Sequence, residues 1–130
     1  MQSSFHFIQL EEVIALQKAI NEASSESHGI RDESGLESPL NAAPQRAHYE
    51  NASLAICAAT YAYHLTTAHA FVDGNKRIGV GVAFLFIRLN GGTYNANEHE
   101  WHDLFMGIAA ATITRTQTEE FFTARVIPPA

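Results

Sequence analysis

Asn51-Ala-Ser-Leu-Ala-Ile-Cys-Ala-Ala-Thr-Tyr-Ala-Tyr-His-Leu-Thr-Thr-Ala-His-Ala70 is the stretch that decides the fold. An apolar stripe recurs in it at helical spacing and consists of Leu54, Ala58, Tyr61 and Leu65. The small residues between them leave very little polar surface on the opposite side. A helix that is apolar on nearly all sides is usually buried at the centre of its fold. We therefore predict a central helix over residues 51–70.

Two further apolar-periodic stretches flank this central segment. The first predicts a helix from about Phe7 to Asn21, and the second predicts a helix from about Asn75 to Asn90. Asn90-Gly91-Gly92 is a strong signal for the end of the second helix. A break therefore separates the central helix from the one over residues 75–90.

The segment ahead of the central helix has a weaker pattern. Residues 30–44 are predicted to hold a short helix that Asp32 caps, Pro39 weakens and Pro44 ends. Residues 45–50 are then expected to be a connector.

The C-terminal part of the chain carries two spacings of the capping-box type. Asn97-x-x-Glu100 and Thr116-x-x-Glu119 predict the starts of two more helices. Thr93-Tyr94 can form a brief extended piece, but no long strand alternation is present. The sequence thus predicts an all-α fold and a single domain over residues 1–130.

Composition and charge exclude several classes of function. A chain of 130 residues has room for one core of normal size. Eight Lys and Arg against 14 Asp and Glu give a net charge of −6, which disfavours nucleic acid as a partner. The longest apolar run, Ile78 to Leu89, is shorter than the ~20 residues of a membrane span. With no leader-like start, we expect a cytoplasmic protein that contacts no membrane.

The break between the two most apolar helices reads His69-Ala-Phe-Val-Asp-Gly-Asn-Lys-Arg77. His69 can accept a proton at neutral pH, and Asp73 offers the carboxylate oxygens that Mg²⁺ prefers. Phe71 is expected to anchor the stretch in the core. Taken singly, each residue also has a structural explanation, such as a helix cap or a turn.

The second half of this stretch has the chemistry of an anion site. Gly74 and Asn75 begin the next helix, where free N–H groups favour a phosphate. Lys76 and Arg77 add positive charge. A base, a metal carboxylate and an anion site together indicate transfer of a phosphate-containing group to a hydroxyl.

The stretch His69-x-Phe71-x-Asp73-Gly74-Asn75-Lys76-Arg77 resembles the signature of the Fic/Doc superfamily, and more closely its Doc (death on curing) toxin branch. Other parts of the chain look like that branch, namely Gly29-x-Arg31-Asp32-x-x-Gly35-Leu36, Ala43-Pro44-Gln45 and Ala83-Phe84-Leu85-Phe86-Ile87-Arg88-Leu89-Asn90-Gly91. The resemblance implies a compact helical fold whose active loop joins two core helices.

The resemblance also implies roles for the residues of the loop. His69 would deprotonate a Ser, Thr or Tyr hydroxyl that attacks a nucleotide phosphate, and Asp73 would hold the metal. The phosphate cradle would consist of Gly74, Asn75, Lys76 and Arg77.

Two departures separate this chain from the AMP-transferring branch, which has glycine at the position of Lys76 and arginine at that of Val80. The Doc branch shares both departures, and it passes the γ-phosphate of ATP to a translation elongation factor. Gly74, however, is shared with the AMP transferases. The resemblance thus implies a toxin kinase using Mg²⁺ and ATP, with AMP transfer and a non-catalytic partner-binding module as alternatives.

A partner is implied as well. Self-inhibiting members of the superfamily carry a Ser/Thr-x-x-x-Glu helix, and the only such spacing here, Thr116 to Glu120, suits a helix start better. We therefore expect a separate cognate antitoxin. Arg46 and His48 are candidates to border the surface that docks the target protein.

Two other features favour structural roles. Cys57, the only cysteine, is predicted to be a small core residue rather than a nucleophile. His99 and His102 lie one helical turn apart and could bind a metal, but a solvated helix face with Trp101 turned inward is the preferred interpretation.

Overall fold

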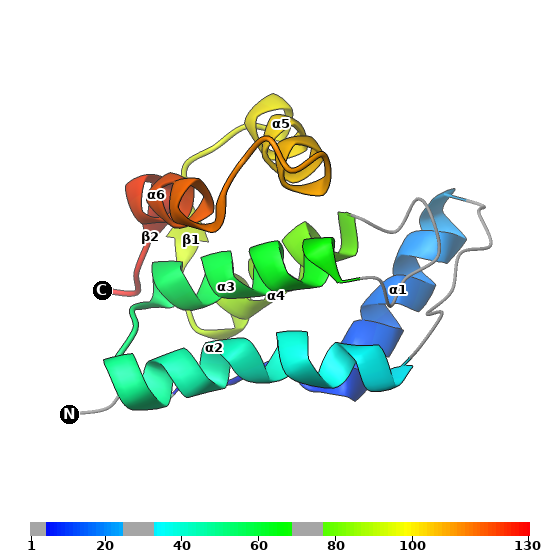
Figure 1. Cartoon of the computed structure of the whole chain (residues 1–130), viewed down its shortest axis with the longest axis horizontal. Helices are drawn as coiled ribbons and strands as arrows, with labels where there is room; N and C mark the ends of the chain where they lie inside the picture. Colours follow the sequence, from blue (N-terminus) through cyan, green and yellow to red (C-terminus); the bar gives the residue numbers. More distant parts are fainter. Residues whose placement is uncertain (1–4, 25–32, 69–76) are drawn as a thin grey trace.

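The computed structural model describes residues 5–24, 33–68 and 77–130 (Figure 1). The described residues form six α-helices, one 3₁₀ helix and two short strands. In chain order these are α1 (Leu10–Ser24), η1 (Glu33–Leu36), α2 (Glu37–Glu50), α3 (Leu54–Thr67), α4 (Arg77–Leu89), β1 (Thr93–Tyr94), α5 (Glu98–Ala109), α6 (Arg115–Arg125) and β2 (Val126–Ile127). The strands pair antiparallel, with Tyr94 opposite Val126. The predicted all-α class is confirmed.

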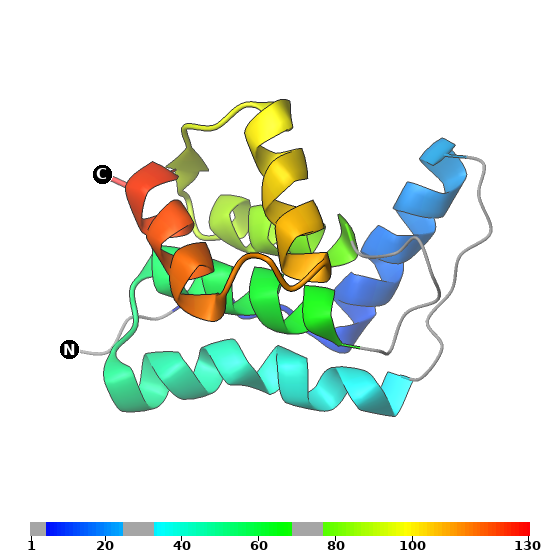
Figure 2. The ribbon, with the colours of Figure 1, turned by 45° about the horizontal axis from the view of Figure 1, so that its top comes forward.

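Helix α3 is the centre of the molecule. It packs against α2, α4, α5 and α6, and Figures 1 and 2 show α2 along one side of it with α6 on another. Tyr61 and Leu65 are fully buried. The helix begins after Ser53, whose side chain accepts a hydrogen bond from the Ile56 N–H at 3.2 Å. The prediction of a buried central helix is confirmed, with bounds of 54–67 rather than 51–70.

The last turn of α3 and the first turn of α4 lie in close contact. A Cβ atom added at Gly79 would lie 2.8 Å from the Thr66 backbone nitrogen and 2.9 Å from the Ala62 carbonyl oxygen. Real Cβ atoms essentially never come so close to other heavy atoms. Only glycine therefore permits this separation between the two helices.

An extended N-terminal segment, residues 5–9, is fixed to α3 and α4. The backbone N–H of Ile8 donates to the Tyr61 hydroxyl at 3.0 Å in a buried bond. The Asn90 side chain accepts from the His6 N–H at 2.7 Å and donates to the His6 carbonyl at 3.1 Å. The ring of Phe7 stacks on Phe86 with centroids 6.0 Å apart. The predicted helix start at residue 7 was therefore wrong, since α1 begins at Leu10.

Helix α2 corrects two sequence predictions. Pro44 lies inside the helix and does not end it, and residues 45–50 are helical rather than a connector. Pro39 lies in the first turn, where backbone N–H groups lack helical partners in any case. Pro44 does remove one helical hydrogen bond, but buried Leu40 and Ala43 lie on this helix, which packs against α3. Such packing offsets the lost bond, because most helix stability in proteins is tertiary.

The starts of α5 and α6 both carry a capping box. The Asn97 box with Glu100 is present as predicted. The second box was placed wrongly, because α6 is capped by Thr114 with Gln117 instead of Thr116 with Glu119. The Glu119 carboxylate instead contacts two arginines.

The aromatic rings of the C-terminal half gather around one indole. Trp101 is 6% exposed and contacts Phe84 at a centroid distance of 4.4 Å. His99 and His102 are exposed on the same helix, which confirms the predicted inward Trp101 on a solvated helix.

Among the described residues, no group of three or more metal-ligating side chains occurs, and no helix has the length and apolarity to cross a membrane.

Replacing Gly79 by alanine should destabilise the protein. The added methyl group meets backbone atoms, so α3 and α4 must separate. Such overpacking typically costs about 1–3 kcal/mol, which outweighs the roughly 1 kcal/mol that alanine gains over glycine in an open helix. We expect urea denaturation to show a lower free energy of unfolding for Gly79→Ala. Arg88→Ala, on the exposed face of the same helix, is the control and should be nearly neutral. A stabilised Gly79→Ala protein would contradict the close contact.

Tyr61→Phe should also lower stability. The substitution removes the hydroxyl that accepts the buried Ile8 N–H and leaves that donor unsatisfied, at a cost of about 1–3 kcal/mol. Tyr49→Phe removes the same hydroxyl from a side chain that is 80% exposed and should leave the melting temperature unchanged. Equal effects of the two substitutions would show that the Ile8–Tyr61 bond does not contribute.

Candidate functional site

The residues that the sequence singled out fall largely outside the described part of the chain. His69, Phe71, Asp73, Gly74, Asn75 and Lys76 all do so. Arg77 is the first residue of α4, and its side chain is not described. The predicted loop anchor and the predicted base, metal ligand and phosphate groups therefore remain predictions.

The structure does fix both ends of this stretch. Helix α3 ends at Thr67, and the N–H of the next residue, Ala68, donates to the Leu65 carbonyl at 3.3 Å. Helix α4 begins at Arg77, and Gly79 holds its first turn against Thr66. The predicted break between the two central helices is thus confirmed. Both ends of the connecting residues are fixed to the core.

A surface groove lies beside the C-terminal half of α3, between α2, α3 and α6. It consists of two hollows of about 390 and about 350 Å³ that share Ala42, Gln45 and His64, and we call it the α2–α3 groove. The first hollow is completed by Glu37, Ser38 and Asn41. The second is completed by Arg46, Tyr49, Glu50 and Arg115.

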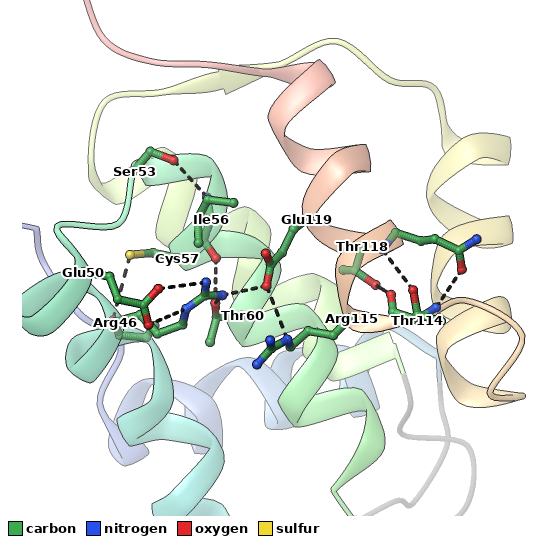
Figure 3. Close-up of polar contacts among 12 residues, drawn as sticks. Arg46, Glu50, Ser53, Ile56, Cys57, Thr60, Thr114, Arg115, Thr118 and Glu119 are labelled. Carbon is green, nitrogen blue, oxygen red and sulfur yellow. Dashed lines mark hydrogen bonds and ion pairs between the residues drawn. The ribbon is translucent and has the colours of Figure 1, made fainter.

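One wall of this groove is held by a partly buried ion-pair cluster (Figure 3). Arg46 donates from Nη1 to Glu119 Oε2 at 2.6 Å and from Nη2 to Glu50 Oε1 at 3.2 Å. The Nη1 group also contacts the Thr60 hydroxyl at 3.2 Å. The hydrogen bond to Glu50 is the first cause that raises the Arg46 pKa. Arg46 therefore joins α2, α3 and α6.

His64 is half-buried and faces both hollows. Burial is the main cause that lowers its pKa, and the positive charges of Arg115 and Arg46 lower it further. Glu119 acts in the opposite direction. A lowered pKa favours the neutral imidazole, which offers one N–H donor and one acceptor nitrogen to the groove.

Cys57 does not belong to any reactive site. Its side chain is fully buried, and its thiol lies 3.9 Å from the Ala43 carbonyl and 3.8 Å from the Ala52 carbonyl. Burial raises the pKa of the thiol to about 11. A thiol of that pKa is protonated at pH 7 and is a poor nucleophile, which confirms the predicted core role.

With this geometry in place, the comparison with known families becomes informative. A sequence model of the Fic/DOC family matches residues 7–87, which is more than half of the chain. The chain belongs to the Fic/DOC family. Members of this family are in general transferases. A search among curated proteins finds no match.

The Fic/DOC match bears on the two regions of the site differently. It spans the stretch from His69 to Arg77, which carries the predicted chemistry, and it spans the α2 and α3 walls of the groove. It stops before α6, which contributes Arg115. The sequence predicted Arg46 at a docking surface, and the structure places Arg46 in the groove. Sequence reasoning assigned no role to His64 or Arg115, because nothing in the spacing of these two residues shows that they lie beside the same groove.

The pKa of His64 can be tested by following its ring protons by NMR as the pH changes. We expect a titration midpoint below that of a free imidazole. Arg115→Gln should raise the midpoint because it removes a nearby positive charge, and Glu119→Gln should lower it. Two shifts of the same sign would contradict the arrangement.

The lowered pKa of His64 also predicts how the stability of the fold depends on pH. The folded chain binds a proton at His64 less readily than the unfolded chain does. The free energy of unfolding should therefore fall as the pH drops below about 6.5. His64→Gln should reduce that pH dependence.

Proposed function

We propose that this Fic/DOC-family protein transfers the γ-phosphate of ATP to a hydroxyl group of another protein. The observation that carries this proposal is the sequence His69-x-Phe71-x-Asp73-Gly74-Asn75-Lys76-Arg77, which follows α3 in the chain and runs into the start of α4. The chain that carries this sequence belongs to a family of transferases. The family match supports group transfer in general. The choice of the γ-phosphate rests on Lys76, which lies inside the motif, and on Val80, three residues after the motif ends.

Lys76 and Val80 favour phosphate transfer over AMP transfer. The AMP-transferring branch has an arginine where this chain has Val80, and Val80 is only 4% exposed and belongs to the core. A buried valine offers no donor to a nucleotide phosphate. The Lys76 side chain occupies a position that is glycine in that branch, so it would take up space needed by the nucleotide.

In the proposed reaction, His69 removes the proton from the acceptor hydroxyl. The hydroxyl oxygen then forms a bond to the γ-phosphorus, and the bond from that phosphorus to the β,γ-bridging oxygen breaks, so ADP leaves. The N–H groups at Gly74 and Asn75 and the cations of Lys76 and Arg77 bind the phosphates. Asp73 would hold Mg²⁺, which neutralises phosphate charge when bound.

The biological setting is part of the same proposal. By its resemblance to the Doc branch, the protein acts in the cytoplasm as the toxin of a toxin–antitoxin pair. Its acceptor would be a translation elongation factor, and modification of that factor would stop protein synthesis. A cognate antitoxin would hold the protein inactive.

AMP transfer is the second candidate, because Gly74 is also found in that branch. In that reaction the hydroxyl oxygen would bond to the α-phosphorus, and diphosphate would leave. A non-catalytic module that binds a partner is the third candidate. The three differ in which atom of ATP, if any, reaches the acceptor.

The test is incubation of the purified protein with a translating lysate and ATP labelled at either the α or the γ position. We expect γ-label on a protein that mass spectrometry then identifies. His69→Ala should lower the rate about 100-fold or more, because it removes the general base, and should leave the melting temperature nearly unchanged. His102→Ala, at an exposed histidine, is the control. α-Label on the acceptor would establish AMP transfer. In a separate growth assay, in which the protein is expressed in cells without an antitoxin, growth inhibition retained by His69→Ala would favour the binding module.

A further inference from the structure

The α2–α3 groove lies close to the catalytic stretch along the chain. His64 lines both of its hollows and precedes His69 by five residues. Five residues span at most about 18 Å even when fully extended. Whatever path the chain takes after Ala68, the Cα atom of His69 must lie within that distance of the Cα atom of His64. A bound peptide of a few residues can cover this distance.

Arg115 gives the groove one available positive charge. Its side chain is 56% exposed, and its Nε atom lies 3.6 Å from Glu119 Oε2. That oxygen is already engaged by Arg46 at 2.6 Å, and Glu50 also pairs with Arg46. In the described part of the chain this long ion pair uses Nε, and no hydrogen bond engages the Nη groups of Arg115. They can therefore take a carboxylate in bidentate geometry.

The rest of the lining suits a peptide rather than a nucleotide. Asn41 and Gln45 are exposed amides in the two hollows, and they can both donate to and accept from peptide groups. Glu37 and Glu50 are exposed carboxylates in the first and second hollow, respectively. These carboxylates would repel a polyphosphate that fills the groove. A single acidic side chain needs to contact only Arg115.

An exposed aromatic ring borders the same groove. Tyr49 is 80% exposed and lines the second hollow together with Arg115. Tyrosine and arginine are among the residue types enriched at the energetic centres of protein interfaces. Their combination here is that of a protein-docking surface.

We propose that the α2–α3 groove docks the acceptor protein through an extended segment whose acidic side chain pairs with Arg115. This inference rests on the proposed function and adds a substrate preference to it, namely an acceptor hydroxyl with a carboxylate near it in the same segment. Gln45 and His64 bind the peptide groups that lie between the acceptor hydroxyl and this carboxylate. The groove thus selects the protein that the catalytic stretch modifies.

The test measures initial rates of γ-label transfer to the lysate protein that wild type labels, over a range of concentrations of that purified protein and of ATP. Arg115→Gln and Arg115→Glu should raise KM for the acceptor about tenfold or more, because each loses a charge-assisted pair. The kcat and the KM for ATP should stay within about twofold. Arg88→Glu, which makes the same charge reversal on an exposed face of α4, should behave as wild type.

A second arm reverses the charges. Once the acceptor is identified, replacing the acidic residue near its modified hydroxyl by lysine should lower transfer by wild type and restore transfer by Arg115→Glu. Unchanged melting temperatures for both Arg115 variants exclude a folding defect as the cause.

The outcomes separate the two proposals. If wild type labels no protein, the proposed function is wrong, and the docking inference fails with it. If wild type and both Arg115 variants label the acceptor with equal KM, the docking inference is wrong and the proposed function stands. A rise in KM for ATP would assign Arg115 to the nucleotide instead. Variants that lose only self-association in size-exclusion chromatography would assign the groove to a second copy of the chain. Each of these last two results overturns the docking inference.

Discussion

The contact between Gly79 and the last turn of α3 is the constraint on which the rest of the structure depends. It brings α4 so close to the central helix that even a methyl group would meet the Thr66 nitrogen and the Ala62 carbonyl. Because the two helices cannot shift apart without losing this packing, the polar stretch between them starts and ends at fixed points. Precise placement of both ends is what group transfer requires, since positioning and charge supply most of the rate.

A second level of organisation comes from Arg46. Its guanidinium joins a residue four positions away, Glu50, and a residue 73 positions away, Glu119. Both Arg46 and Glu119 are 19% exposed, so the pair is shielded from solvent more than a surface ion pair. It ties α6 to α2 and sets where Arg115, at the start of α6, stands relative to the groove. The acceptor selection that we propose and the stability of the helix packing thus depend on one set of side chains.

The sequence was sufficient for the parts of the fold that local pattern controls. The apolar stripe from Leu54 to Leu65 predicted the central helix, and Asn97 predicted the start of α5. Helix α2 was not predictable from local rules, because they read Pro44 as an end and the packing against α3 overrides them. The start of α6 had two overlapping capping signals, and Glu119 does not serve as a capping residue because it pairs with Arg46, which is 73 positions away, and with the neighbouring Arg115. The polar motif predicted the chemistry, whereas the groove joins residues of three helices that no spacing relates.

The double hydrogen bond between His6 and Asn90 joins residues 84 positions apart. Contacts this distant in sequence form late, because a long loop must close before they are made. During synthesis the segment around His6 leaves the ribosome before α4 does, so it has no place to dock until the end of α4 has emerged. The segment around His6 is therefore secured only after residues that are made much later than it. Nascent chains of the protein should expose Phe5 and Phe7, which pack on Phe86 in the finished fold, for most of the time that the domain takes to be translated.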